Sequence, residues 1–120
     1  MARILVVDDE PLLVRALERL LARAGFETSS ASNGSAALEL IARYDFSLII
    51  CDVRMPVMDG VGLLRALANQ GPPVVMLTGY GDESDQALRE LGASAVLGKP
   101  VGFSTLIEVI AKFARQRTPH

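Results

Sequence analysis

The chain has 120 residues, half of them hydrophobic and 22% charged, a balance typical of a globular protein rather than a disordered one. This length suits one domain that is large enough to bury a core. With a formal net charge of −2 the chain offers no basic surface, so we expect it to bind neither nucleic acid nor an anionic membrane directly.

The cysteine content and the hydropathy pattern favour a cytoplasmic location. Cys51 is the single cysteine, which excludes an internal disulfide and suits a reducing compartment; we interpret it as a small buried residue at a strand end. No apolar run reaches the roughly 18 residues needed to span a membrane, and the N-terminus has no signal-peptide pattern. We therefore predict a cytoplasmic protein that does not enter a membrane.

The first half of the chain predicts two strand–helix units. A strand at Ile4–Val7 precedes a helix that begins at Pro11 and ends with Gly25 as its C-terminal cap. The apolar stripe of this helix comprises Leu13, Leu17, Leu20 and Ala24. A weaker strand pattern at Thr28–Ala31 is followed by the turn Ser32–Gly34. The helix after this turn has its apolar stripe at Ala37, Leu38 and Ile41.

The second half predicts three more units of the same kind. Strands are expected at Phe46–Cys51, at Val74–Leu77 and, from a weaker pattern, at Ala95–Leu97. Asp59-Gly60 caps the start of the next helix, and Gly92 ends the one after it. The apolar stripes of the three helices are Leu63, Leu64 and Leu67; Ala87, Leu88 and Leu91; and Phe103, Leu106, Ile107, Ile110 and Phe113.

Strict alternation of strands and helices predicts an α/β fold with a doubly wound parallel sheet and helices on both faces. In such sheets the functional crevice lies beyond the carboxyl ends of the strands. The residues expected just past these ends are Asp8, Asp9, Asp52, Thr78 and Lys99.

Three carboxylates at one sheet edge point to a metal ion. Asp8, Asp9 and Asp52 would repel one another by about 1–4 kcal/mol per close pair, depending on the local dielectric. Oxygen ligands without a histidine or cysteine cluster suit Mg²⁺ better than zinc. Together with Thr78 and Lys99, the set is suited to a phosphoryl group, and a carboxylate within it can form an aspartyl phosphate.

Each of these residues also has a purely structural interpretation. Asp9 or Glu10 would cap the first helix, and Asp52 alone would be a solvated acid at a strand tip. Lys99 alone would be a surface lysine, and Thr78 alone a turn hydroxyl. Their joint placement at one sheet edge favours the functional interpretation.

Four segments in order resemble the receiver domain of two-component response regulators. They are VVDDE, LIICDVRMPVMDG, VVMLTGYGD and GASAVLGKPV. The resemblance extends from Arg3 to about Arg115, and we expect a receiver domain over residues 1–117 with a flexible tail at 118–120. It implies a flavodoxin-like fold, similar to that of chemotaxis regulators, with five parallel strands in the order 2-1-3-4-5 and five helices.

The resemblance also implies a role for each residue of the cluster. Asp52 would accept the phosphoryl group, Thr78 and Lys99 would hold its oxygens, and the Lys99-Pro100 bond would be cis. The ligands of Mg²⁺ would be Asp8, Asp9, Asp52 and the backbone carbonyl of Arg54, with Asp8 acting largely through a metal-bound water.

Several positions depart from the family's usual pattern. Val96 stands three residues before the lysine, where the family usually has a tyrosine or phenylalanine that reports phosphorylation. Arg54 and Tyr80 are bulky and flank the site, at positions that tend to govern how easily water attacks the phosphoryl group in this family. Gly102 stands where an acidic cap of the last helix is common.

The leading hypothesis is a signalling switch. A sensor histidine kinase or phosphotransfer protein would donate a phosphoryl group to Asp52, and a downstream effector protein or fused output domain would read the changed surface. The domain would catalyse its own phosphorylation and dephosphorylation without turning over a substrate, and a phosphorylation-dependent dimer stays open.

The main alternative is a constitutive docking module with vestigial phosphorylation. The complete set of site residues argues against it, and Val96 argues weakly for it. A phosphatase-like hydrolase is disfavoured because Arg54 stands where that class has a second acid. No glycine-rich loop follows the first strand, which disfavours nucleotide binding.

Overall fold

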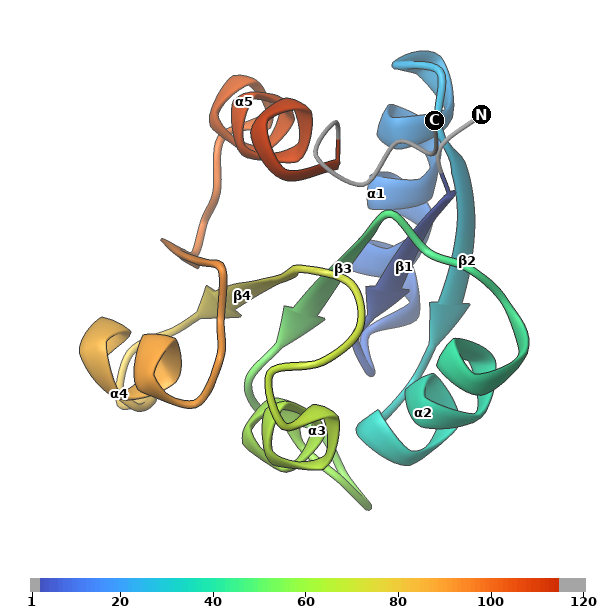
Figure 1. Ribbon diagram of the computed structural model, residues 1–120. Helices are drawn as coiled ribbons and strands as arrows, with labels where there is room; N and C mark the ends of the chain where they lie inside the picture. Colours follow the sequence, from blue (N-terminus) through green and yellow to red (C-terminus); the bar gives the residue numbers. More distant parts are fainter. Residues whose placement is uncertain (1–2, 115–120) are drawn as a thin grey trace.

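Strands and helices alternate along the chain in the computed structural model, which describes residues 3–114 (Figure 1). In chain order the elements are β1 (Arg3–Val7), α1 (Pro11–Arg23), β2 (Glu27–Ala31), α2 (Gly34–Arg43), β3 (Leu48–Asp52), α3 (Gly60–Leu67), β4 (Val74–Thr78), α4 (Asp85–Glu90), β5 (Ala95–Gly98) and α5 (Phe103–Ala114). The expected domain end at residue 117 and the tail at 118–120 lie outside the described residues. None of the helices within 3–114 has the length and apolar character needed to cross a bilayer.

The five strands form one parallel sheet in the order β2-β1-β3-β4-β5, which confirms the predicted topology. The order reverses at β1, because β2 pairs with one side of it and β3 with the other. At this switch point the chain leaves β1 and β3 in opposite directions, and in sheets of this kind ligands bind beyond the carboxyl ends of such strands. Val7 pairs with Cys51 there, so the residues that follow them are neighbours.

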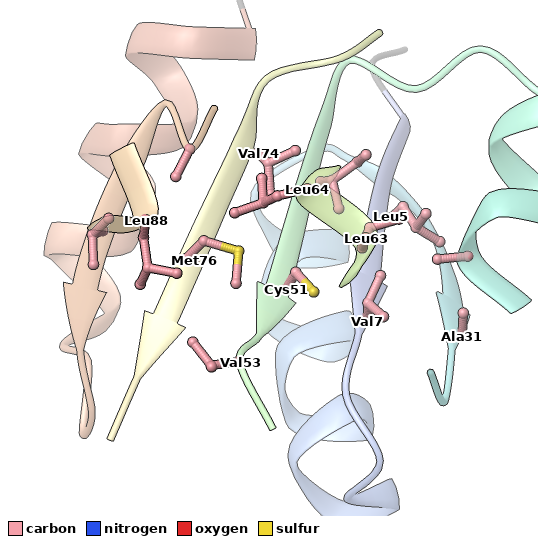
Figure 2. Close-up of a cluster of buried hydrophobic side chains, with 14 of the residues drawn as sticks. Leu5, Val7, Ala31, Cys51, Val53, Leu63, Leu64, Val74, Met76 and Leu88 are labelled. Atoms are coloured by element: carbon pink, nitrogen blue, oxygen red, sulfur yellow. The ribbon is translucent and has the colours of Figure 1, made fainter. Parts of the chain in front are cut away.

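Both faces of the sheet are covered by helices, and the strand side chains alternate between two buried clusters. Helices α2, α3 and α4 cover one face, and α1 and α5 cover the other (Figure 1). Figure 2 shows the first cluster, in which Leu63 and Leu64 of α3 lie near Leu5 and Val74 of the sheet. The central strands are therefore rigid supports for whatever stands at their ends.

The helix ends follow the expected capping chemistry. The N–H groups of Gly25 and Phe26 donate to the carbonyls of Ala22 and Leu21, a Schellman motif in which Gly25 takes the left-handed conformation with φ of 94°. The same motif ends α4 at Gly92. The side chain of Asp59 accepts the N–H of Gly62 at 2.8 Å and so caps α3, as predicted.

The structure corrects three sequence-based boundaries. The third strand begins at Leu48 rather than Phe46, although Phe46 is buried. Asp52 and Thr78 are the last residues of β3 and β4 rather than the residues beyond them. Both side chains are therefore fixed by strand backbone and not by a loop.

The predicted apolar stripe of α1 is also partly wrong. Its buried residues are Val14, Leu17 and Leu21. Leu13 and Leu20 instead line an apolar groove between α1 and α5. The apolar side of this helix is broad, so periodicity alone does not fix which residues face the sheet.

The loop from β3 to α3 approaches the sheet and α2 closely. A Cβ on Gly60 would lie 2.5 Å from the carbonyl oxygen of Asp52, so close approach rather than backbone freedom requires glycine there. The Met58 side chain lies against Gly34 and Gly62, where a Cβ would meet its Cγ at 2.8 and 2.9 Å. Gly34 N–H also donates to the Met58 carbonyl at 2.7 Å. The Met58 side chain therefore packs between the starts of α2 and α3.

The same loop holds one valine in a strained conformation, which gives a stability prediction. Val57 has φ of 68° and is 86% exposed, so its side chain loses little apolar contact if replaced. We expect Val57→Asn to raise the free energy of unfolding by about 1 kcal/mol, because asparagine tolerates the left-handed region better than a β-branched residue. Urea unfolding measures this. Val57→Ala is the control that keeps a Cβ, and equal gains in both variants would contradict the explanation.

Candidate functional site

The carboxyl edge of the sheet brings together the five side chains that the sequence placed there. Asp8 and Asp9 follow β1, Asp52 ends β3, Thr78 ends β4 and Lys99 follows β5. Strand register explains the convergence, because Asp52 pairs with Leu77, the residue before Thr78, and Thr78 pairs with Gly98, the residue before Lys99. The prediction from strand-end rules is confirmed in space.

Three carboxylates gather at the switch point. Asp8, Asp9 and Asp52 each offer one oxygen, and these oxygens all lie within 4.8 Å of one another. Asp8 and Asp52 are buried and Asp9 is exposed. Unscreened carboxylates this close repel, so the cluster is destabilising unless a cation compensates it.

Asp8 is held by the backbone on both sides. Its N–H donates to the Ala31 carbonyl at 3.1 Å, and its Oδ1 accepts the Glu10 N–H at 2.9 Å. Glu10 is the N-cap residue of α1, but its side chain makes no cap hydrogen bond within residues 3–114, so the alternative of capping by Glu10 is not found. Instead, Asp8 satisfies the backbone donor that precedes the helix.

The second oxygen of Asp8 has no hydrogen-bond partner among residues 3–114, although it is buried. Burial raises the pKa of this carboxyl, and the negative charges of Asp52 and Asp9 act in the same direction. The Glu10 N–H and the Lys99 ammonium, 4.0 Å from Oδ2, act against the rise without cancelling it. A buried oxygen that lacks a donor within the described ranges, beside two more carboxylates, fits a hard divalent cation that accepts oxygen ligands.

Lys99 contacts the carboxylate of Asp52 directly. Its Nζ lies 2.8 Å from Asp52 Oδ1, which also accepts the Val53 N–H at 3.0 Å. Burial alone would lower the pKa of Lys99, but the hydrogen bond to Asp52 and the charges of Asp52 and Asp8 outweigh it and raise the pKa. Lys99 therefore stays charged, and Asp52 Oδ2 makes no hydrogen bond within the described residues.

Thr78 lies beside this pair on the neighbouring strand. Its carbonyl accepts the Lys99 N–H at 2.7 Å, which ties the ends of β4 and β5 together. Within the described part of the chain its hydroxyl has only a long contact of 3.5 Å, to the Leu97 carbonyl, so it is available to a better acceptor. The Lys99-Pro100 peptide bond is cis, as the resemblance implied.

Comparison with known proteins assigns this arrangement to a family. Residues 4–111 match the family model described as the response regulator receiver domain. The chain is a response regulator receiver domain.

Curated relatives of this receiver domain are longer proteins. It is 41% identical over 119 residues to the response regulator protein PilR of Pseudomonas aeruginosa, and 38% identical over 122 residues to FleR of the same organism. These matches cover 96% and 98% of the chain but only 26% of each relative. The chain thus spans about a quarter of their length.

Solved structures share the fold over the whole domain. A receiver domain protein from Clostridium thermocellum has a TM-score of 0.89 at 28% identity, covering 98% of this chain and 97% of that one. The receiver domain of a signal transduction histidine kinase from Syntrophus aciditrophicus also has a TM-score of 0.89, at 32% identity, with coverage of 99% and 96%. The receiver fold is therefore established by sequence and by shape.

Sequence reasoning missed the partner of Arg54 in this receiver domain. Arg54 Nε lies 2.5 Å from Asp82 Oδ1, and Arg54 Nη2 donates to the Gly81 carbonyl at 2.8 Å. Burial alone would raise the pKa of Asp82, but the Gly79 N–H and the Arg54 guanidinium overcome this and lower it. Arg54 and Asp82 are 28 residues apart on two loops, so their contact leaves no local sequence pattern. The one signal in the sequence is a charge of opposite sign on each loop.

The two other unusual side chains lie in opposite environments. Val96 is 7% exposed and belongs to the buried cluster that contains Met76 and Leu88. Tyr80 is fully exposed on the loop after β4. Cys51 is buried, and burial raises its pKa, which confirms the structural interpretation of this thiol.

The crowded carboxylates give a prediction for the metal-free protein. At about pH 7 and with a chelator present, we expect Asp8→Asn to unfold with a free energy about 1 kcal/mol higher than the wild type. The substitution keeps the oxygen that accepts the Glu10 N–H and removes a buried charge. The pKa of Asp8 is raised by folding, so the penalty is present above the folded pKa and disappears as pH falls towards the ordinary value.

Urea unfolding at neutral and acidic pH checks this expectation. The difference in free energy of unfolding between Asp8→Asn and the wild type should become smaller as the pH is lowered. Asp45→Asn, which removes an exposed charge, is the matched control and should change stability little at either pH. A variant no more stable than the wild type without metal would show that the Asp8 charge is compensated within the protein.

Proposed function

We propose that this receiver domain is a phosphorylation-activated signalling switch in which Asp52 accepts a phosphoryl group. The donor would be a sensor histidine kinase or a phosphotransfer protein, and a downstream effector protein or fused output domain would read the result. The observation that carries the proposal is the pairing of Lys99 with one oxygen of Asp52, beside a buried Asp8 oxygen for which residues 3–114 provide no hydrogen-bond donor.

The geometry supports Asp52 as the nucleophile. Its Oδ1 is held by Lys99 and by the Val53 N–H, while Oδ2, which has no hydrogen bond from any described residue, would attack phosphorus. The new O–P bond forms as the P–N bond of a phosphohistidine donor breaks, and the electron pair of that bond stays on the imidazole nitrogen. Lys99 neutralises charge on the transferred group.

Thr78 provides the response to the new group. Its hydroxyl exchanges the long contact with the Leu97 carbonyl for a phosphoryl oxygen, which is a charged and stronger acceptor. Such a move draws the end of β4 and the loop after it towards Asp52. The change in surface that a partner reads would begin there.

The acidic cluster fits Mg²⁺ as cofactor. Asp8, Asp9, Asp52 and the backbone carbonyl of Arg54 would hold it, all with oxygen donors. When bound, the ion would offset the charge of the carboxylates and of the phosphoryl oxygens. Asp8 Oδ2 is buried and has no donor among the residues that the structure describes, so it would gain most from contact with the ion.

The proposal also covers the activity, location, extent and assembly of the domain, which we infer from its family. The domain would act on itself in phosphorylation and dephosphorylation and turn over no substrate, in the cytoplasm and without contacting nucleic acid or membrane. We propose residues 1–117 as its extent and a phosphorylation-dependent dimer as one outcome. PilR and FleR are named response regulators of which the chain covers a quarter, so an effector fused in one polypeptide is one form that output would take.

One observation favours a second candidate, a docking module that binds its partner regardless of phosphorylation. Val96 is short and packed into the core, so no aromatic side chain at this position can rotate to report the phosphoryl group. The two candidates differ in whether Asp52 is modified and whether the surface then changes.

The nucleophile is tested with a small phosphodonor and Mg²⁺. We expect intact-mass measurement to show addition of one phosphoryl group to the wild type and none to Asp52→Asn, since the amide is a far weaker nucleophile than the carboxylate. Omitting Mg²⁺ should abolish the addition to the wild type. Asp45→Asn is the control for a general loss of acidic charge, and equal labelling of Asp52→Asn would exclude Asp52 as acceptor.

The route of switching is tested with beryllofluoride, a phosphoryl mimic, and Mg²⁺. We expect backbone amide shifts to be large over residues 78–91 and small over Ala95–Leu97, because the Val96 side chain has no alternative rotamer of comparable reach. Asp52→Asn under the same conditions should show no change of amide shifts in either segment. Equally large shifts along β5 would mean that the fifth strand transmits the change despite its valine.

A further inference from the structure

The loop between β4 and α4 is closed by a single carboxylate, that of Asp82. Its Oδ1 contacts Arg54 Nε, and its Oδ2 accepts the Gly79 N–H at 2.6 Å. The Arg54 Nη2 donates to the Gly81 carbonyl in the same loop. The Asp82 side chain is only 5% exposed, although it stands on a surface loop, so both of its oxygens are engaged and shielded from solvent.

The two donors that Asp82 occupies border the proposed phosphorylation site. Arg54 follows Asp52 by two residues, and Gly79 is the residue after Thr78. Lys99, which contacts Asp52, also acts electrostatically on Asp82. The Asp82 carboxylate therefore lies within the field of the cation that holds the nucleophile.

We propose that Asp82 is an internal competitor of the phosphoryl group: it occupies the Arg54 guanidinium and the Gly79 N–H in the unphosphorylated protein, and a phosphoryl group on Asp52 displaces it from them. This inference rests on the proposed function of Asp52. Asp82 is not one of the proposed site residues, and the nearest of them in sequence is Thr78, four positions before it.

The chemistry of the donors favours such an exchange. A guanidinium and a backbone N–H both bind a carboxylate, but a phosphoryl group offers more oxygens and more negative charge. Arg54 is 71% exposed at its side chain and so has room to turn from one anion to the other. Displacement of Asp82 breaks its contacts with Arg54 and with the Gly79 N–H, so phosphorylation would change the position of loop 79–84 through a change of partner.

A structural latch makes the opposite prediction, and this makes the inference testable. If Asp82 only pre-arranged the loop, its removal would loosen the site and weaken binding of a phosphoryl mimic. If Asp82 competes with the phosphoryl group, its removal frees two donors and strengthens that binding. The sign of the change in affinity separates the two roles.

The experiment titrates beryllofluoride, in the presence of Mg²⁺, into the wild type, Asp82→Ala, Asp82→Asn and Glu83→Ala. Glu83 is the exposed acid next to Asp82, so Glu83→Ala removes the same charge without touching Arg54 or Gly79 and serves as the matched control. We expect Asp82→Ala to bind beryllofluoride about fivefold more tightly than Glu83→Ala, with Asp82→Asn between them. Asp82→Asn keeps the length of the side chain and covers the case in which the alanine variant folds poorly.

Two further measurements make the assignment specific. In the Arg54→Met background the gain from Asp82→Ala should shrink, because one of the two freed donors is then missing. In metal-free protein the Gly79 amide proton should move upfield in Asp82→Ala and stay in place in Glu83→Ala. An affinity of Asp82→Ala equal to or below that of Glu83→Ala would overturn the inference, as would an unchanged Gly79 amide.

Failure of the proposed function would look different. Wild type and Glu83→Ala would then both fail to bind beryllofluoride, and the displacement would be refuted together with the role of Asp52. The Gly79 amide shift in metal-free protein would still show whether Asp82 holds that donor. Weak binding confined to the Asp82 variants, with normal binding by the wild type, would reject the competitor role alone.

Discussion

Negative charge at the carboxyl edge of β1 and β3 is the constraint on which the rest of the site depends. Asp8 and Asp52 are buried there beside Asp9, and among residues 3–114 the one cation in contact with the two buried acids is Lys99. A fold selected for stability alone would not place three carboxylates where the sheet topology forces them together. The surplus of negative charge makes the edge receptive to a divalent cation, and it keeps Lys99 charged beside Asp52.

The rigid and the adaptable parts of the site are divided between strands and loops. Asp52 and Thr78 end buried strands, and Lys99 directly follows β5, so their positions are fixed by ladder pairing and by the packing beneath the sheet. The loop after β3 is also fixed, because Gly60 leaves no space for a Cβ and Met58 fills the gap between α2 and α3. The loop after β4 is anchored by polar side-chain contacts instead: those of Asp82, the hydrogen bond from Arg54 Nη2 to the Gly81 carbonyl, and the cap of α4 by Ser84.

Most of the fold and the five converging side chains could be predicted from sequence for one physical reason. Buried parallel strands show as apolar runs, and their carboxyl ends must meet at one edge, which places Asp8, Asp52 and Lys99 without any knowledge of distances. The buried face of α1 could not be predicted, since its apolar side is broad enough to meet both the sheet and the groove beside α5. The pairing of Arg54 with Asp82 was beyond reach for another reason, because side-chain contacts between loops have no periodicity.

The position of Val96 gives the division between strand and loop a consequence for signalling. A valine sealed into the core of the α4 face cannot leave it without opening a cavity, so β5 is a poor place to store two alternative states. The loop after β4 holds its alternatives in exposed polar contacts, which can be exchanged without disturbing the core. This domain has no aromatic reporter on β5. Two states that differ in which anion the loop donors bind would therefore cost less free energy to interconvert than two states that differ in core packing. The fully exposed Tyr80 on that loop would report the change at the surface.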